Sequence, residues 1–342
     1  MSKSEDEEVE VPHPRATFAL FGHAEAEQAL LDEYRSGRIA HAWLIGGPAG
    51  IGKATLAYRM VRFVLAHPDP LAPSVRDATT LAVPPEGPAA RRVAGRAHPD
   101  LLVLEREPDD KGKMRTVITV DQVRRTVGFF GSTAGEGGWR ICVVDPADEL
   151  NPQGMNALLK VLEEPPPRSL FLVVSHAPGR LLPTIRSRCR RLTLRPLGED
   201  DVVRAATAAL GGEADAGELR QAAAAADGSV ARAIALAGGS QLALRDKLNE
   251  LFGRLPATDP RALHALGDSI DRDDDLFEVF IETSRNWLSV RLDRVTDPAR
   301  LDRIAEAFER LNGAARDAEI YNLERKPLVF NVFGLLAEAA RG

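Results

Sequence analysis

The chain carries, at residues 43–55, the run Trp43-Leu44-Ile45-Gly46-Gly47-Pro48-Ala49-Gly50-Ile51-Gly52-Lys53-Ala54-Thr55. An apolar stretch, a glycine-rich loop and a run of helix-forming residues follow one another here, which is the order found in a phosphate-binding P-loop. We expect the backbone N–H groups of Gly50, Gly52 and Lys53 to converge on phosphate oxygens at the start of a helix. The Lys53 ammonium is expected to reach the outer phosphates.

One position departs from the P-loop pattern GxxxxGK[ST], into which residues 47–53 fit. The residue after the lysine normally supplies a hydroxyl to magnesium, and here it is Ala54. Thr55 does not replace that hydroxyl, because successive helical residues are turned by roughly 100° and its side chain faces elsewhere. The loop can still hold an anion, but it lacks a magnesium ligand. The expected phosphate-site residues of this loop are Gly47, Gly50, Gly52, Lys53 and Thr55.

Bulk properties describe a globular protein of more than one domain. A length of 342 residues suggests two or three domains at about 150 residues each. The hydrophobic content of 44% and the charged content of 27% are ordinary for a soluble protein. The net charge of −6 argues against a protein that coats DNA by electrostatics alone. No apolar run reaches the roughly 18 residues needed to cross a bilayer, and no secretory pattern is present, so we expect a cytoplasmic protein.

The two cysteines, Cys142 and Cys189, can build neither a disulfide framework nor a four-cysteine zinc site. Each lies in or beside a β-like run, so we interpret them as buried reduced thiols. From about His67 to His98 the chain is rich in proline, alanine and arginine without a clear period. We interpret this segment as an irregular surface excursion.

Short apolar runs alternate with helical stretches from Thr17 to about Leu194. Runs that are apolar almost throughout are typical of strands covered on both faces. We therefore predict an α/β P-loop domain with a parallel five-stranded sheet flanked by helices. The expected strands are residues 42–45, 101–104, 140–144, 170–174 and 191–194. Asn151 and Pro152 predict the start of a helix that must stop by Glu164, because three prolines follow.

Composition divides the chain into four parts. Residues 1–14 are acidic and contain prolines, which predicts a mobile tail. Residues 15–195 hold the P-loop domain, and the alanine-rich residues 196–241 contain three short helical patterns that predict a small helical domain. Residues 242–342 are helical by pattern and end in a helix that is apolar on nearly every side. A monomer core and burial against partner subunits explain that last helix equally well.

A second nucleotide-site element is predicted at Arg140-Ile141-Cys142-Val143-Val144-Asp145, an apolar strand that ends in an aspartate like a Walker B strand. In hydrolytic AAA+ ATPases the next residue is usually a glutamate that orients the attacking water; here it is Pro146. A proline side chain can neither accept a proton nor position water. With Ala54, this makes two missing parts of a hydrolytic apparatus.

Several motifs occur in one order along the chain: Phe21-Gly22-His23, Ile39-Ala40-His41-Ala42, the near P-loop, Asp145-Pro146-Ala147-Asp148, Asn156-Ala157-Leu158-Leu159-Lys160-Val161-Leu162-Glu163-Glu164-Pro165-Pro166 and Ser187-Arg188-Cys189. Through these motifs, roughly residues 18–238 resemble the clamp-loader branch of AAA+ proteins, most closely the delta prime subunits of bacterial DNA polymerase III. The resemblance implies a subunit of the pentameric machine that opens the ring-shaped sliding clamp and places it on primed DNA. In that family delta prime is the stationary member, with a degenerate nucleotide site.

The resemblance also implies roles for single residues. Arg188 is similar to an arginine finger, which is inserted in trans beside the γ-phosphate held by a neighbouring subunit; an always-charged planar fork of donors suits that work. Ser175 resembles the sensor 1 residue and Arg232 the sensor 2 residue of a helical lid. From the residues alone, a solvated or ion-paired Arg188 remains the alternative. The same alternative is our interpretation of the surrounding Arg180, Arg186, Arg190, Arg191 and Arg195.

The implied partners are gamma/tau-type motor subunits and a delta-type subunit in a hetero-pentamer, with the sliding clamp and primer–template DNA contacted through the complex. Residues 196–241 correspond to the lid and residues 242–342 to the oligomerisation collar. The chain is then a component of the DNA-directed DNA polymerase holoenzyme at the bacterial replisome, without ATPase activity of its own. No cofactor is required, no zinc is expected, and ATP or ADP binds weakly at most. An active AAA+ motor subunit of the same complex and a small-molecule P-loop phosphotransferase are the alternative functions.

Overall fold

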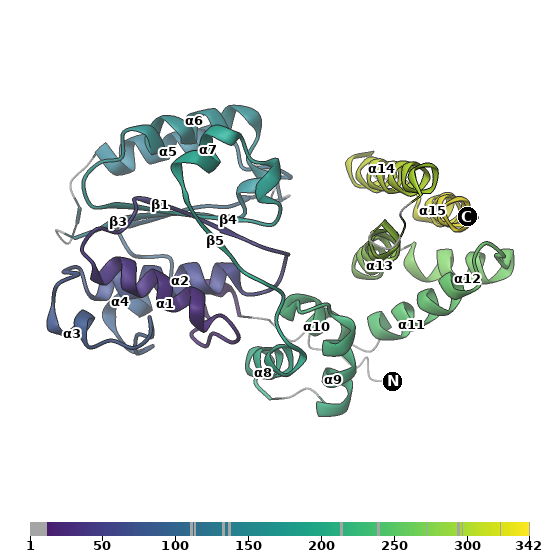
Figure 1. Ribbon diagram of the computed structural model, residues 1–342, viewed down its shortest axis with the longest axis horizontal. Coiled ribbons are helices and arrows are strands. Elements are labelled where there is room, and N and C mark those ends of the chain that lie inside the picture. The colour runs from purple at the N-terminus through teal and green to yellow at the C-terminus, as the bar shows by residue number, and fades with distance from the viewer. Residues whose placement is uncertain are drawn as a thin grey trace. The chain divides into compact units, whose positions relative to one another are not determined.

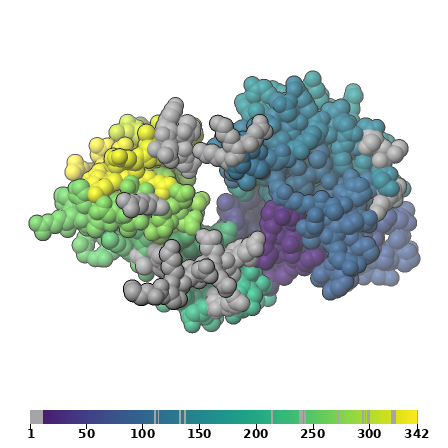
Figure 2. Space-filling view, turned by 180° about the vertical axis from the view of Figure 1, so that it is seen from behind, coloured from purple at the N-terminus to yellow at the C-terminus, as the bar shows by residue number. Residues whose placement is uncertain are grey.

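The computed structural model describes residues 12–109, 112, 114–131, 134–135, 138–212, 215–237, 240–271, 273–292, 295, 297–321 and 323–341; the others are grey in Figures 1 and 2. The chain divides into two compact units, Met1–Ile234 and Ala235–Gly342. The first contains a sheet and helices, and the second is helical. Among the described residues, no helix is long and apolar enough to cross a membrane.

Five parallel strands form the sheet of the first unit, in the order β2-β3-β4-β1-β5. The predicted parallel fold is confirmed, and each predicted strand differs from the observed one by at most one residue at either end. The strands are β1 (Ala42–Gly46), β2 (Leu101–Leu104), β3 (Arg140–Val144), β4 (Ser169–Ser175) and β5 (Arg190–Thr193).

Helices cover both faces of this sheet (Figure 1). Alternate strand residues point to opposite faces: Trp43 and Ile45 join one buried cluster, whereas Leu44 and Phe171 join the other. Cover on both sides is the reason why β1, β3 and β4 are apolar almost throughout, whereas the edge strand β5 carries the exposed Arg190 and Arg191. The first cluster is closed by α1 (Ala24–Arg35) and α2 (Lys53–Ala66), and the second by α5 (Val120–Gly131), α6 (Pro152–Glu163) and α7 (Pro183–Arg188).

Helix α6 begins and ends where the sequence predicts. The Asn151 side-chain oxygen accepts a hydrogen bond from the Gly154 N–H at 2.7 Å and so caps the first turn, with Pro152 at the first helical position. The helix ends at Glu163, just before the run of three prolines. The buried side chains of Leu158 and Leu162 hold it in the cluster that covers the second face of the sheet. This rigid element carries Glu163 at its last turn.

The excursion at residues 67–98 is more deeply buried than the sequence predicted. It contains two short helices, α3 (Pro73–Arg76) and α4 (Pro88–Ala94), and its Val75, Leu81 and Val93 are fully buried beside α2. A carboxylate oxygen of Glu27 accepts hydrogen bonds from the Leu81 N–H at 3.0 Å and from the Arg59 guanidinium. The interpretation of a purely surface excursion is therefore wrong, because its apolar residues complete the core.

The predicted tail at residues 1–14 falls mostly outside the described residues. Residues 12–14 are described, and Pro14–Ala16 form a short 3₁₀ helix. The buried Arg62 guanidinium donates to the carbonyl oxygens of Arg15 at 2.8 Å and Thr17 at 2.7 Å, and it lies over the Phe18 ring. These contacts hold the N-terminal segment against α2, so residues 12–14 belong to the folded unit rather than to a tail.

Three short helices follow the sheet and pack around a small apolar cluster of their own, which includes Val202, Ala223 and Ala233. They correspond to the three helical patterns predicted in the alanine-rich stretch. Their bounds are α8 (Glu199–Ala209), α9 (Ala216–Ala225) and α10 (Val230–Ala237). The division of the chain at Ile234 falls inside α10. The predicted separation of residues 196–241 as a domain of their own stays a prediction.

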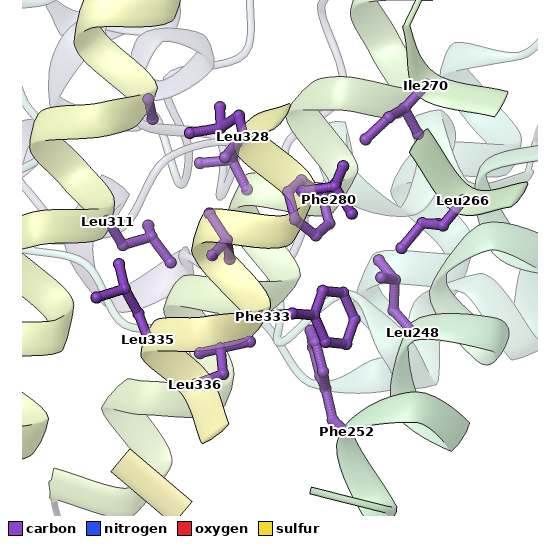
Figure 3. Packing of buried hydrophobic residues seen from close by; sticks show 14 of the residues in the cluster. Leu248, Phe252, Leu266, Ile270, Phe280, Leu311, Leu328, Phe333, Leu335 and Leu336 are labelled. Carbon is purple, nitrogen blue, oxygen red and sulfur yellow. The ribbon is translucent and has the colours of Figure 1, made fainter. Parts of the chain in front are cut away.

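The second unit buries its last helix within itself. Phe333 of α15 lies 5.5 Å from Phe252 and 6.2 Å from Phe280 between ring centroids, and Leu328 and Leu336 are also buried (Figure 3). Of the two explanations for this apolar helix, the core of the chain itself accounts for its buried side chains. The helices are α11 (Ser240–Gly253), α12 (Pro260–Ile270), α13 (Asp274–Leu292), α14 (Pro298–Tyr321) and α15 (Arg325–Ala340).

The burial of the excursion gives a testable prediction. Leu81→Ala should lower the free energy of unfolding of the first unit by about 2–5 kcal/mol, because it leaves a cavity beside α2. The matched control Leu71→Ala, whose side chain is 66% exposed in the same segment, should change it by less than about 0.5 kcal/mol. Urea unfolding followed by tryptophan fluorescence in a Trp287→Phe background reports on this unit through Trp43 and Trp139. Equal effects of the two leucine changes would contradict the buried anchor.

Candidate functional site

The sheet order brings three predicted site positions together. Strand β4 lies between β1 and β3, so the carboxyl ends of these strands are neighbours. The P-loop follows β1, Asp145 follows β3, and Ser175 ends β4. Open parallel sheets bind ligands outside the carboxyl ends of their strands. The fold therefore places the predicted phosphate loop and the Walker B-like aspartate at the edge where a ligand is expected.

A cavity of about 450 Å³ lies at this edge, within the size range of small-molecule sites. Its walls also include Phe18 and Phe21 of the N-terminal segment, His176 after β4, and Ala205 and Val230 of the small helices. Ala54 faces it at the position where a P-loop hydroxyl is missing. The predicted site residues that line it are Gly50, Gly52, Lys53, Thr55 and Asp145, so Thr55 borders the cavity although its side chain was expected to face elsewhere.

Three other predicted residues lie outside the cavity lining. Gly47 packs beneath Leu194, whose carbonyl oxygen would be 2.5 Å from a Cβ at this position. Ser175 is fully buried, and its hydroxyl donates to Asp148 Oδ1 at 2.9 Å. The Arg232 guanidinium pairs with Asp227 at 2.8 Å. The sensor roles of Ser175 and Arg232 stay predictions.

The P-loop lysine is held by its own loop. Lys53 is 3% exposed, and its ammonium donates to the carbonyl oxygen of Pro48. Burial lowers the pKa of Lys53 to about 8, although the nearby carboxylates of Asp145 and Asp148 favour the charged form. The lysine therefore remains a cation at neutral pH, available to an anion but already partnered inside the loop.

The small helices close directly onto the P-loop. The Gly50 carbonyl accepts hydrogen bonds from the backbone N–H groups of Val230 at 2.9 Å and Ala231 at 3.3 Å. Gly50 has a φ of +73°, and a Cβ there would collide with the Ser229 hydroxyl. Glycine is required at this position both by the left-handed backbone and by the close approach of α10.

The surroundings of the Walker B-like Asp145 destabilise the charged form of its carboxyl group. Burial raises the pKa of Asp145 to about 6, and the charge of Glu105 adds to the shift, whereas His13 and Lys53 oppose it. The carboxylate is thus ionised at neutral pH at a free-energy cost to the folded state. Groups that are strained in this way are common at functional sites.

The two carboxylates after Pro146 are engaged elsewhere. Asp148 accepts hydrogen bonds from the backbone N–H groups of His176 at 2.6 Å and Ala177 at 3.0 Å, in addition to the Ser175 hydroxyl. Glu149 forms an ion pair with the Arg106 guanidinium at 2.9 Å. Neither of these two acidic side chains lines the cavity, so neither can position a water there in place of Pro146.

Sequence reasoning assigned no role to three residues that shape this edge. The buried His23 contacts the Ile51 carbonyl oxygen through Nε2 at 2.6 Å and so supports the P-loop. His176 lines the cavity, where burial and the Lys53 charge lower its pKa. Asp148 organises the end of β4. His23 and Asp148 belong to quoted motifs and His176 directly follows Ser175, so their positions were visible but their contacts were not.

Arg188 lies away from this cavity, at the last residue of α7. One guanidinium nitrogen, Nη1, donates to the Thr184 carbonyl oxygen at 3.0 Å, and the other, Nη2, donates to Glu163 Oε1 at 2.6 Å. Its side chain is 33% exposed. Arg190 pairs with Glu33 and lies over the Trp43 ring, in line with the ion-pairing role interpreted for it.

Comparison with known proteins identifies the family. A family model described as DNA polymerase III, delta subunit, matches residues 22–198, slightly more than half of the chain. The chain belongs to this family. The predicted resemblance to delta prime subunits is confirmed by curated relatives that carry the name DNA polymerase III subunit delta'. The arrangement of P-loop, Walker B-like strand and five-stranded sheet is the one that the sequence pattern predicted.

Two of these relatives show how far the similarity extends. The subunit delta' of Pseudomonas aeruginosa is 44% identical over 150 residues, which cover 44% of this chain and 42% of the relative. The subunit delta' of Escherichia coli K12 is 34% identical over 176 residues, covering 52% and 48%. The chain thus matches less than half the length of each of these two relatives.

More distant similarities include a DNA polymerase III subunit gamma/tau of Mycobacterium tuberculosis, 30% identical over 186 residues that cover 53% of this chain and 29% of the relative. A solved structure of a gamma subunit-related protein from Thermotoga maritima covers 94% of this chain and 100% of its own, at 18% identity and a TM-score of 0.42.

The strained aspartate gives a prediction with a defined pH dependence. Asp145→Asn should raise the free energy of unfolding of the first unit by about 1–3 kcal/mol at pH 7. The pKa of Asp145 is raised from 3.8 to about 6, so the folded state binds this proton more tightly than the unfolded state does. Proton binding therefore stabilises the folded state fully below pH 3.8, and this stabilisation is lost as the pH rises through 6. The gain from asparagine should therefore shrink as the pH falls from 7 towards 4. Urea unfolding at pH 5, 6, 7 and 8 measures it.

A neighbouring carboxylate provides the control. Asp148→Asn keeps Oδ1 but replaces Oδ2, which accepts from the His176 N–H, with an NH2 donor that faces this N–H, and should destabilise the unit by about 1–3 kcal/mol at pH 7. The two substitutions remove the same charge three residues apart, yet their effects should have opposite signs. A loss of stability in Asp145→Asn at pH 7 would show that the carboxylate is not strained.

Proposed function

We propose that this chain acts as the delta prime-type stator of a clamp-loader complex, helping to place the sliding clamp on primed DNA during replication without hydrolysing ATP itself. The observation that carries the proposal is a P-loop edge that lacks both the metal-binding hydroxyl directly after the lysine and a water-positioning carboxylate at Pro146. Residues 22–198 match the family described as DNA polymerase III, delta subunit, which supports a role of this altered site in replication.

Hydrolysis of ATP needs a metal held on the phosphates and a water oriented for in-line attack. Ala54 has no ligand atom, and Pro146 has no basic atom. The adjacent carboxylates of Asp148 and Glu149 are held by hydrogen bonds and an ion pair outside the cavity. What remains, Lys53 with the N–H groups at the start of α2, supports anion binding without turnover.

Arg188 is the residue proposed to act on a neighbour. It lies outside its own chain's cavity, and its guanidinium is partly exposed at the end of α7. An arginine in this position can meet the γ-phosphate in an adjoining subunit, where it would stabilise the charge that spreads over the phosphoryl oxygens in the transition state. Arginine fingers contribute about 10³–10⁵ in rate at the site that they serve.

The partners proposed are gamma/tau-type motor subunits and a delta-type subunit, with the clamp and the primer–template reached through the assembly. The similarity to the gamma/tau relative covers 53% of this chain at 30% identity, which supports a common P-loop core among the subunits. The helical residues 242–342 are proposed as the oligomerisation collar. A motor ATPase has less support because of Ala54 and Pro146, and a small-molecule phosphotransferase leaves the Ser187-Arg188-Cys189 motif unexplained.

The first test concerns the isolated chain. Purified protein should hydrolyse ATP far below the roughly 1 s⁻¹ of competent phosphoryl-transfer enzymes. Any binding of ATP or ADP, measured by calorimetry, should have the same affinity with magnesium and with EDTA, because Ala54 cannot hold the ion. Magnesium-dependent turnover near 1 s⁻¹ that survives further purification would support the motor alternative.

The second test concerns the assembled complex. Arg188→Ala should leave the isolated chain folded, yet the complex with motor and delta-type subunits should lose the share of DNA-stimulated ATP hydrolysis contributed by the adjoining site. Arg191→Ala, which removes an exposed arginine three residues away, is the matched control and should keep the unmodified rate. If the Arg188→Ala complex hydrolyses ATP and loads clamps normally, Arg188 is not a finger.

A further inference from the structure

Glu163 forms a hydrogen bond with Arg188, the arginine that the proposed function places in a neighbour's active site. Its Oε1 accepts a hydrogen bond from Arg188 Nη2 at 2.6 Å, although the two residues are 25 positions apart in the sequence. The pair is partly exposed, with 33% of the arginine side chain and 48% of the glutamate side chain accessible. The second contact, from Nη1 to the Thr184 carbonyl, lies one turn back on α7.

From this geometry we infer that Glu163 is a positioning residue for Arg188: it holds the guanidinium in the orientation that Arg188 uses in trans, without itself touching the nucleotide. The inference rests on the proposed function of Arg188. A long arginine side chain samples many rotamers, and the entropy lost when it is ordered opposes the formation of any contact that it makes. Two contacts within its own subunit order the Arg188 side chain in advance, which lowers the entropy cost of binding the neighbouring phosphate.

The element that carries Glu163 is suited to this work. Helix α6 is capped by Asn151 at its start, and its penultimate residue Leu162 is 1% exposed in the core. Ile185 of α7 is buried in the same cluster as Leu162, so the two helices that carry the pair are fixed to each other. The carboxylate of Glu163 therefore has a defined place relative to α7.

The contacts leave the arginine able to react to a phosphate. A guanidinium has five N–H donors. The two hydrogen bonds described for Arg188 use one from each terminal nitrogen, which leaves three N–H groups that can turn to phosphate oxygens. Glu163 can thus keep its hydrogen bond while Arg188 binds in the adjoining site, as expected of a support rather than a competitor.

The experiment compares complexes reconstituted with motor and delta-type subunits. The Arg188-dependent hydrolysis is the rate of the unmodified complex minus the rate of the Arg188→Ala complex. Glu163→Gln should lower it about 2- to 5-fold, the range expected for a partly exposed ion pair. The loss should appear in kcat more than in the KM for ATP, because the finger acts on the transition state. Glu163→Asp, which keeps the charge but withdraws it by one methylene, should give an intermediate rate.

The control is Glu164→Gln, which removes the same charge from the next residue; Glu164 is exposed, and no contact with Arg188 is described for it. This variant should hydrolyse ATP at the unmodified rate. Glu163→Gln should also have no further effect in an Arg188→Ala background, and thermal unfolding of the isolated Glu163→Gln chain should match that of Glu164→Gln. This set separates a positioning role from a change in folding.

The outcomes are distinct. If Arg188→Ala slows the complex but Glu163→Gln behaves like Glu164→Gln, the finger stands and the positioning role is overturned. An increase in rate for Glu163→Gln means that Glu163 competes with phosphate, which also overturns it. A further loss in the Arg188→Ala background assigns Glu163 a role independent of the finger. If Arg188→Ala itself has no effect, the proposed function of Arg188 fails first.

Discussion

The hydrogen bonds of the Asp148 carboxylate determine what the edge of the sheet can do. They join the segment after β3 to the end of β4 through one hydroxyl and two backbone N–H groups. A carboxylate that accepts three hydrogen bonds is held firmly in place, because both of its oxygens already have donors. The first acidic residue after the expected catalytic position, Asp148, is therefore structural. Ser175 is drawn away from the cavity by the same interaction, and His176 takes its place in the lining.

The same edge keeps two charges whose burial is unfavourable. Lys53 has a lowered pKa and Asp145 a raised one, and in both cases loss of water is the main cause. Their mutual attraction offsets only part of this cost. A fold under selection for stability alone would replace both with apolar residues. Their presence beside the cavity is what the proposed phosphate-binding edge needs, although Ala54 supplies no metal ligand and Pro146 no base.

The sheet could be predicted from the sequence because both of its faces are covered. Strands β1, β3 and β4 are then apolar almost throughout, and the glycine-rich loop marks which strand is β1. The packing of the excursion could not be predicted, since Val75, Leu81 and Val93 follow no helical or strand period and their polar anchor Glu27 is 54 residues from Leu81. At the site, the residue types identified the P-loop and Asp145. They could not show that Ser175 faces Asp148 or that Arg232 pairs with Asp227, because side-chain direction depends on elements that meet only in the folded chain.

The partial exposure of the Arg188–Glu163 pair bears directly on a function in trans. A fully buried ion pair is costly to break, typically about 3–5 kcal/mol, because one charge is left without water or partner. An exposed arginine without partners would enter a neighbouring site in many conformations and lose side-chain entropy there. The observed pair lies between these limits: it is ordered by two contacts yet remains partly in water. An arginine in this state can exchange solvent for phosphate oxygens at little cost, which is the property required of a residue that completes another molecule's active site.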